Sequence, residues 1–175
     1  MTPLQKVAMG LVIVIVDARF EDFDAVPDVL GWVLALVGLR DLRERLDGVG
    51  WLLFAAAMST AVAGAELWPG AMDSLDKSTG WFLSLPQLLF SVLMCQAMTV
   101  LAEVDDPATA RRFGWLRWVF GALMLAPAVG YGGGVEAVVK GGELVTIAAN
   151  VYLVYLLFKV SRQPYATAPA EADPD

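Results

Sequence analysis

The sequence predicts an all-α protein, a polytopic bundle of about six transmembrane helices with both termini in the cytoplasm. The first reason is composition: 58% of the 175 residues are hydrophobic and 18% are charged, whereas soluble domains average roughly 45–50% apolar and about 25% charged residues. The mean hydropathy is +0.61. The second reason is the length of the apolar runs, and the third is the distribution of lysine and arginine between them.

Six apolar runs approach the roughly 20 residues that a helix needs to cross about 30 Å of hydrocarbon. Short polar turns separate them, so we expect a single transmembrane domain over residues 1–160. The second run is short, and the fifth contains Arg117. In chain order the runs are Leu4–Phe20, Ala25–Leu39, Val49–Ala65, Gly80–Ala102, Phe113–Val129 and Leu144–Val160.

Basic residues set the expected orientation, because lysine and arginine accumulate in cytoplasmic loops. With the N-terminus inside, nine of the twelve basic residues fall inside, and only Arg19, Lys77 and Lys140 fall outside. The outer segments then hold ten acidic residues against three basic ones, so the whole net charge of −7 is external. We therefore expect a multi-pass protein of the inner (plasma) membrane.

The stretch VDARFEDFDAVPDVLGW forms the first outer turn and carries five carboxylates and one arginine between two apolar runs. The turn is short, so Asp17 and Asp28 are expected at or below the headgroups, where ionisable groups are costly and usually functional. The single arginine would lower that cost by pairing with Asp17, Asp24 or Asp28. A solvated acidic loop is the simpler alternative. The candidate polar cluster comprises Asp17, Arg19, Asp24, Asp28 and, from the next outer connection, Glu66.

Two other interpretations of the first two runs stay open. A re-entrant hairpin would dip from the inside and return without crossing, although it would bury most of the charges in the turn. A signal peptide would use Lys6 and the run Val7–Val16. We favour two crossing helices, because the first run leads directly into a second one with the polarity of a hairpin.

A polar stripe marks the fourth run. Its members recur at spacings of three and four residues, so they lie on one helical face. Such a face is expected to meet protein or water instead of lipid, through hydrogen bonds between helices or as the wall of a hydrophilic path. The stripe comprises Ser84, Gln87, Ser91, Cys95 and Thr99.

The run KVAMGLVIVIVDARFEDFDAVPDVLGWVLALVGLRDL resembles the N-terminal hairpin of small, largely uncharacterised multi-pass bacterial membrane proteins. In those proteins an apolar run ends in Asp-x-Arg, and a Pro-Asp-x-x-Gly-Trp/Tyr element begins the next helix. The resemblance covers roughly the first quarter of the chain and implies a membrane hairpin without implying an activity. The matching positions are Asp17, Arg19, Asp24, Pro27, Asp28 and Gly31.

Residue usage limits the chemistry. The chain has no histidine and one cysteine, which excludes disulfides, CxxC redox pairs and His/Cys zinc sites within it. We expect no enzyme activity, catalytic residue, cofactor or metal, and no nucleic-acid partner. The expected function is a membrane component that docks a protein partner, a second copy or a lipid headgroup through its acidic outer hairpin. The alternative is a small channel or transporter for a cation or a proton.

The C-terminal segment, residues 161–175, is rich in proline, alanine and acidic residues. Such a composition provides too little apolar surface to offset the entropy of ordering the chain. We expect this tail to be disordered.

Overall fold

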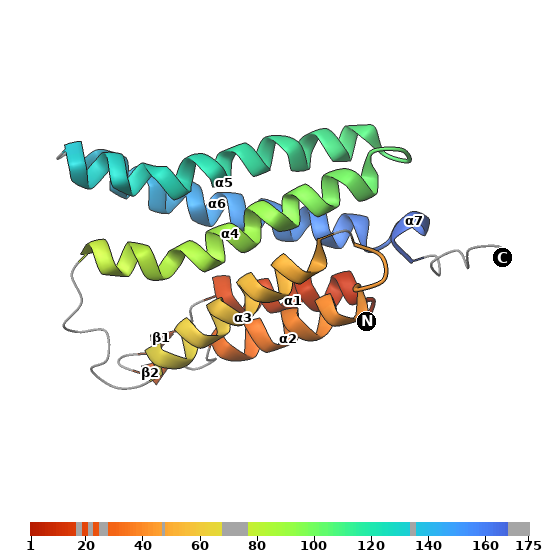
Figure 1. The fold of residues 1–175 in the computed structure, drawn as a ribbon, viewed down its shortest axis with the longest axis horizontal. Coiled ribbons are helices and arrows are strands. Elements are labelled where there is room, and N and C mark those ends of the chain that lie inside the picture. Colours follow the sequence, from red (N-terminus) through yellow and green to blue (C-terminus); the bar gives the residue numbers. More distant parts are fainter. Residues whose placement is uncertain are drawn as a thin grey trace.

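The structure, a computed structural model, describes residues 1–16, 19–20, 23–24, 28–46, 48–67, 77–133 and 136–167. Six long helices run along the longest axis and alternate in direction (Figure 1). Their bounds are α1 Pro3–Ile15, α2 Asp28–Asp41, α3 Val49–Glu66, α4 Lys77–Ala102, α5 Pro107–Gly133 and α6 Glu136–Val160. Each corresponds to one predicted apolar run, so the expectation of a helical bundle is confirmed.

Two short elements add to the predicted set. Strands β1 (Arg19–Phe20) and β2 (Phe23–Asp24) form an antiparallel hairpin between α1 and α2. A one-turn helix, α7 (Pro164–Thr167), follows α6. In Figure 1 the strands mark one end of the bundle, which we call the hairpin end. The N-terminus, α7 and the connections α2–α3 and α4–α5 mark the opposite end, which we call the terminus end.

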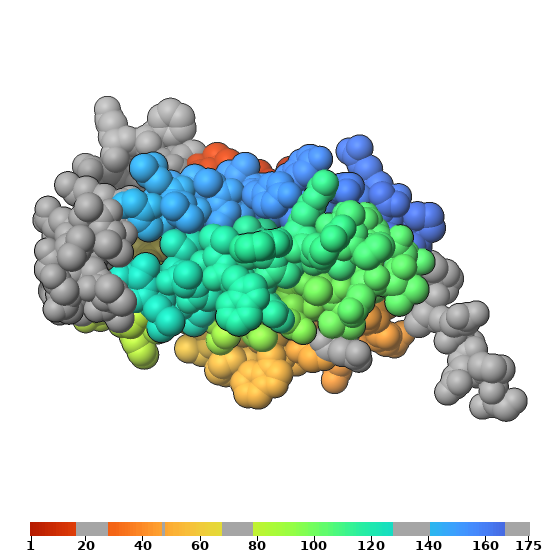
Figure 2. Space-filling view, turned by 90° about the horizontal axis from the view of Figure 1, so that it is seen from above, coloured from red at the N-terminus to blue at the C-terminus, as the bar shows by residue number. Residues whose placement is uncertain are grey.

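The helices form a closed ring. Each one packs on its neighbours in the sequence, and α1 also packs on α6, which closes the circle. Figure 1 shows α1 to α3 as one group and α4 to α6 as the other. Figure 2 shows α6, α5, α4 and α3 in succession across one face of the molecule.

The α1–α2 pair is the closest contact in the ring, because glycines let the two backbones approach each other. A Cβ added to Gly31 would lie 2.5 Å from the Gly10 carbonyl oxygen, and one added to Gly38 would lie 2.7 Å from that of Pro3. Small residues at spacings of three and four are the usual means of close helix packing in membranes. Gly64 of α3 makes no such approach, because a Cβ added there meets nothing within 4 Å.

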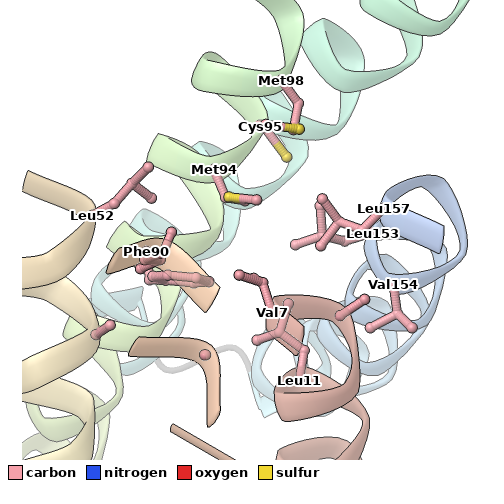
Figure 3. Close-up of a cluster of buried hydrophobic side chains, with 14 of the residues drawn as sticks. Val7, Leu11, Leu52, Phe90, Met94, Cys95, Met98, Leu153, Val154 and Leu157 are labelled. Atoms are coloured by element: carbon pink, nitrogen blue, oxygen red, sulfur yellow. The ribbon is translucent and has the colours of Figure 1, made fainter. Parts of the chain in front are cut away.

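Apolar side chains fill the centre of the ring. Val7, Leu11, Phe90, Met94 and Leu153 come from three helices and are almost fully buried (Figure 3). The Trp32 ring adds an edge-on contact with Phe90, with centroids 5.2 Å apart. Around the ring the outward side chains are also apolar, with Trp51 68% and Trp115 76% exposed. A bundle that is apolar inside and outside suits a lipid environment.

Within the described residues, three helices are long and apolar enough to cross a membrane, over Val49–Glu66, Thr79–Ala102 and Gly141–Val160. The helix α1 is apolar but has only 13 residues. At a rise of about 1.5 Å per residue it extends about 20 Å. The helix α5 has 27 residues, but its first half contains three arginines, which lower its hydropathy.

Polar groups join the elements at the terminus end. The Lys6 ammonium lies 2.6 Å from Asp41 Oδ2 and ties α1 to α2. The Asp106 carboxylate caps α5, accepting the Thr109 backbone N–H at 3.0 Å and the Thr109 hydroxyl at 2.5 Å. Lys159 of α6 donates to the same hydroxyl at 2.9 Å. These contacts tie the end of α2 to α1 and the start of α5 to the end of α6.

The expectation that disorder begins at Ser161 is wrong for residues 161–167. Ser161 and Ala166 are buried, and Arg45 Nη1 donates a hydrogen bond of 3.1 Å to the Ala166 carbonyl oxygen. The apolar groups of Tyr165 and Ala166 pack on the core. This burial offsets the conformational entropy that is lost when the segment becomes ordered, which composition alone does not reveal. Residues 168–175 lie outside the described part of the chain.

Candidate functional site

The predicted polar cluster is partly described. Asp17 lies outside the described residues. Arg19 and Asp24 are backbone partners in the register of the β1–β2 hairpin. The backbone register therefore makes Asp24 the cross-strand neighbour of Arg19.

The other two members, Asp28 and Glu66, share a pocket of about 100 Å³ between α2, α3 and α4 at the hairpin end. Each helix contributes side chains one or two turns apart, which is how a helix presents one face to a neighbour. The polar lining and the indole beside it come from Asp28 and Trp32 of α2, Ser59 and Glu66 of α3, and Ser84 and Gln87 of α4.

Exposure decreases from the rim of this pocket to its floor. Glu66 and Ser84 are exposed, and Asp28 and Gln87 are half-buried. Ser59 and Trp32 are 4% and 2% exposed. One carboxylate oxygen of Asp28, Oδ1, is buried. The pocket therefore leads from an acidic rim to a floor of one hydroxyl group and an indole.

Local structure accounts for the position of each acid. Asp28 lies in the first turn of α2, where a negative charge interacts favourably with the helix dipole. Glu66 is the last residue of α3. Because α2 and α3 run in opposite directions, these two helix ends meet beside the start of α4.

The predicted stripe on α4 divides into two parts. Ser84 and Gln87 line the pocket with the two acids. Ser91 and Cys95 lie in the apolar centre, 1% and 0% exposed, and Cys95 is beside Met94 and Met98 in Figure 3. Thr99 borders a different groove at the terminus end. The stripe therefore does not line one continuous path.

The hydroxyl groups of the stripe bond within their own helix. Ser91 donates to the Gln87 carbonyl oxygen at 3.1 Å, and Thr99 donates to that of Cys95 at 2.8 Å. Ser84 donates to the Trp81 carbonyl oxygen at 2.7 Å. The interpretation of these hydroxyls as donors between helices is therefore wrong, because the nearest acceptor is the carbonyl group one turn earlier.

Two polar contacts were missed by sequence reasoning. Arg117 of α5 donates to the side-chain amide oxygen of Gln96 on α4, and its guanidinium lies 5.4 Å from the centroid of the Trp118 ring. The available signal was Arg117 itself, a charge within an apolar run that needs a polar partner. Gln96 lies outside the predicted stripe and gave no comparable signal.

The second missed contact is the Asp106 cap. The hydrogen bonds from Thr109 hold the pKa of Asp106 below its ordinary value, with smaller contributions from Lys159 and Arg112. The signal was the sequence DPAT, in which an aspartate precedes a proline at the first helical position. This carboxylate is structural, because its partners are the first turn of α5 and the end of α6.

The pocket at the hairpin end could hold a few water molecules or exchange a small cation or proton with its two carboxylates. Within the described ranges, histidine, cysteine, aspartate and glutamate side chains form no group of three that could hold a metal ion. No nucleophile paired with a base is evident among the pocket residues. Comparison with protein-family models, curated proteins and solved structures finds no match to this chain.

Proposed function

We propose that the chain is a non-enzymatic, six-span component of the inner (plasma) membrane, with both termini in the cytoplasm, that docks a partner through its acidic outer hairpin. The partner is another membrane protein, a second copy or a lipid headgroup. The resemblance of the first quarter to small multi-pass membrane proteins belongs to the same proposal.

The distribution of charge between the two ends supports this orientation. The N-terminus, the α2–α3 connection and the start of α5 lie together at the terminus end. That end gathers Arg40, Arg43, Arg45, Arg111 and Arg112. Because basic residues are retained in the cytoplasm, the terminus end is assigned to the inside and the hairpin end to the outside.

The observation that carries the docking proposal is the closed apolar centre beneath an acidic end. Phe90, Met94 and Leu153 fill the axis of the ring below the pocket. Conduction along this axis would need polar groups or water, but packed apolar side chains occupy it. Charges that lie above a sealed core are better placed to bind something at the surface.

Cysteine labelling in intact cells tests the orientation. Labels introduced at Ala71 and Gly133 should react with a membrane-impermeant reagent from outside, and a label at Ala108 should react only after the membrane is opened. Cys95 is buried, so it should give little background. Labelling of Ala108 from outside would contradict the six-span arrangement.

A crosslinking experiment tests the docking role. Photoreactive side chains at Phe20 and Phe23, on the hairpin strands, should give one discrete adduct in native membranes. Neutralising Asp24 and Asp28 should reduce that adduct, whereas Glu44→Gln, an exposed acid at the opposite end, should not. An adduct that persists in the neutralised variant, or that Glu44→Gln reduces equally, would rule out docking through the hairpin charges.

Transport of a cation or a proton is the second candidate, and the pocket with Asp28 and Glu66 is the observation that favours it. Purified protein in liposomes should then show flux that Asp28→Asn abolishes. Gln87→Leu, at the pocket wall, should reduce flux while stability in detergent changes by about 1 kcal/mol or less. Absence of flux from folded protein would leave docking as the function.

A further inference from the structure

We propose that the groove between α4 and α5 at the terminus end binds one phospholipid with a phosphoethanolamine headgroup. The groove has a volume of about 730 Å³. Its walls come from the end of α4 with the turn that follows, and from the first half of α5. The residues that the argument uses are Thr99, Glu103, Arg111, Gly114, Trp115 and Trp118.

The groove carries one positive and one negative side chain. Arg111 and Glu103 are both exposed. Among the described residues, neither side chain forms an ion pair or a hydrogen bond, with the other or with a third group. The neighbouring cation, Arg112, is by contrast close enough to Asp106 to affect its pKa. The groove thus offers two charges of opposite sign that are available to a ligand.

The order of groups along the groove matches the order of groups in a phospholipid. Glu103 follows the last residue of α4, and Arg111 is in the second turn of α5, so both charges lie near the helix ends. Trp115 and Trp118 lie one and two turns further into α5 and are 76% and 69% exposed. Indoles of this kind sit at the boundary between headgroups and acyl chains.

The two charges select a headgroup chemistry. A guanidinium binds phosphate oxygens through paired N–H donors, and a carboxylate accepts hydrogen bonds from a primary ammonium. Phosphoethanolamine carries both groups. Phosphocholine has a quaternary ammonium without N–H donors, and phosphoglycerol has no cation for Glu103. The pair therefore favours ethanolamine over both alternatives.

Gly114 provides a specific test, because a Cβ added there meets nothing within 4 Å. Gly114→Leu should fill the groove without displacing either helix, and leucine is a better helix former than glycine. The variant should consequently fold at least as well as the natural chain, while leaving no room for a lipid beside Trp115.

The experiment measures the melting temperature of the full chain in detergent as a single dioleoyl phospholipid is titrated in. Ethanolamine lipid should bind with a saturable shift. Arg111→Gln and Glu103→Gln should each weaken its apparent affinity about tenfold, the effect of one charge-assisted hydrogen bond. Arg112→Gln, the matched control, should leave the affinity unchanged, and Gly114→Leu should remove the shift.

Choline and glycerol lipids complete the comparison. In the natural chain both should bind about tenfold more weakly than ethanolamine lipid, and Glu103→Gln should not weaken the choline lipid further. Equal binding of the glycerol lipid, equal loss in Arg112→Gln, or an unchanged shift in Gly114→Leu would overturn the proposal. Membrane insertion is measured separately by the cysteine labels, so failure here is distinguishable from failure of the topology.

Discussion

Replacing Gly31 with alanine tests the closest helix contact in the bundle. The added methyl group would lie 2.5 Å from the Gly10 carbonyl oxygen and 2.8 Å from Val14 Cγ2. Ordinary van der Waals contact begins near 3.4 Å, so α1 and α2 would have to separate by about 0.9 Å, the difference between 3.4 and 2.5 Å. The obstacle on α1 is backbone, which cannot rotate away as a side chain can.

The expected cost follows from two opposing effects. Overpacking a well-packed contact costs about 1–3 kcal/mol, and a backbone obstacle places this site at about 3 kcal/mol. Alanine is a better helix former than glycine by about 1 kcal/mol. The net loss in free energy of unfolding is about 2 kcal/mol, or roughly 4–8 °C in melting temperature for a chain of this size.

Thermal unfolding in detergent, followed by tryptophan fluorescence, measures this loss. Gly64→Ala and Gly121→Ala are matched controls, because a Cβ at either position meets nothing within 4 Å. Both controls should melt at or slightly above the temperature of the natural chain. If Gly31→Ala behaved like the controls, α1 and α2 would not be in backbone contact, and the glycine-based account of this hairpin would be wrong.

Three further predictions concern polar contacts. Because the pKa of Asp106 is lowered in the folded chain, its contribution to stability is present above the ordinary aspartate pKa of about 4 and is lost as pH falls through the lower, folded value. Asp106→Asn should therefore lower the melting temperature at pH 7. If the difference in melting temperature between this variant and the natural chain did not shrink in acid, the stabilising role of the Asp106 carboxylate would be refuted. Gln96→Leu should destabilise the chain by removing the acceptor of Arg117, and a double-mutant cycle with Arg117→Leu should give a coupling energy of about 1 kcal/mol. Arg19→Ala should lower yield and melting temperature, and adding Asp24→Asn should recover part of the loss, since the two residues are cross-strand partners; additive effects would mean that they do not interact.

The six helices could be predicted because each depends on local sequence. Lipid offers no hydrogen-bond partners to the backbone, so an apolar run of sufficient length satisfies its own N–H and C=O groups by forming a helix. The residues at which the helices begin and end were less predictable. The helix α5 begins at Pro107, six residues before the predicted run. The Asp106 cap and the proline at the first position start the helix, and the two arginines that follow reduce hydropathy without reducing helix propensity.

Ring closure and the α1–α2 contact could not be predicted, because both depend on which faces meet. Gly10 and Gly31 are unremarkable in a list of apolar residues, and only the structure shows that each faces the other's backbone. The pocket illustrates the same limit. Helical spacing correctly placed Ser84 and Gln87 on one face of α4, but joining them to Asp28 and Glu66 required the packing of three helices.

Unequal helix lengths give the ring a thin side and a thick side. The helices α1 and α2 have 13 and 14 residues, against 26, 27 and 25 in α4, α5 and α6. In the proposed six-span arrangement, a bilayer that meets the short pair would thin locally or admit water above it, and such hydrophobic mismatch costs fractions of a kcal/mol per Å. The membrane around this protein is therefore expected to differ in thickness from one side to the other. It would be compressed beside α1 and α2 and of normal thickness beside α4 and α5. Such a distortion would draw two copies together along their short edges to share it, and would bias the protein toward membranes with shorter acyl chains.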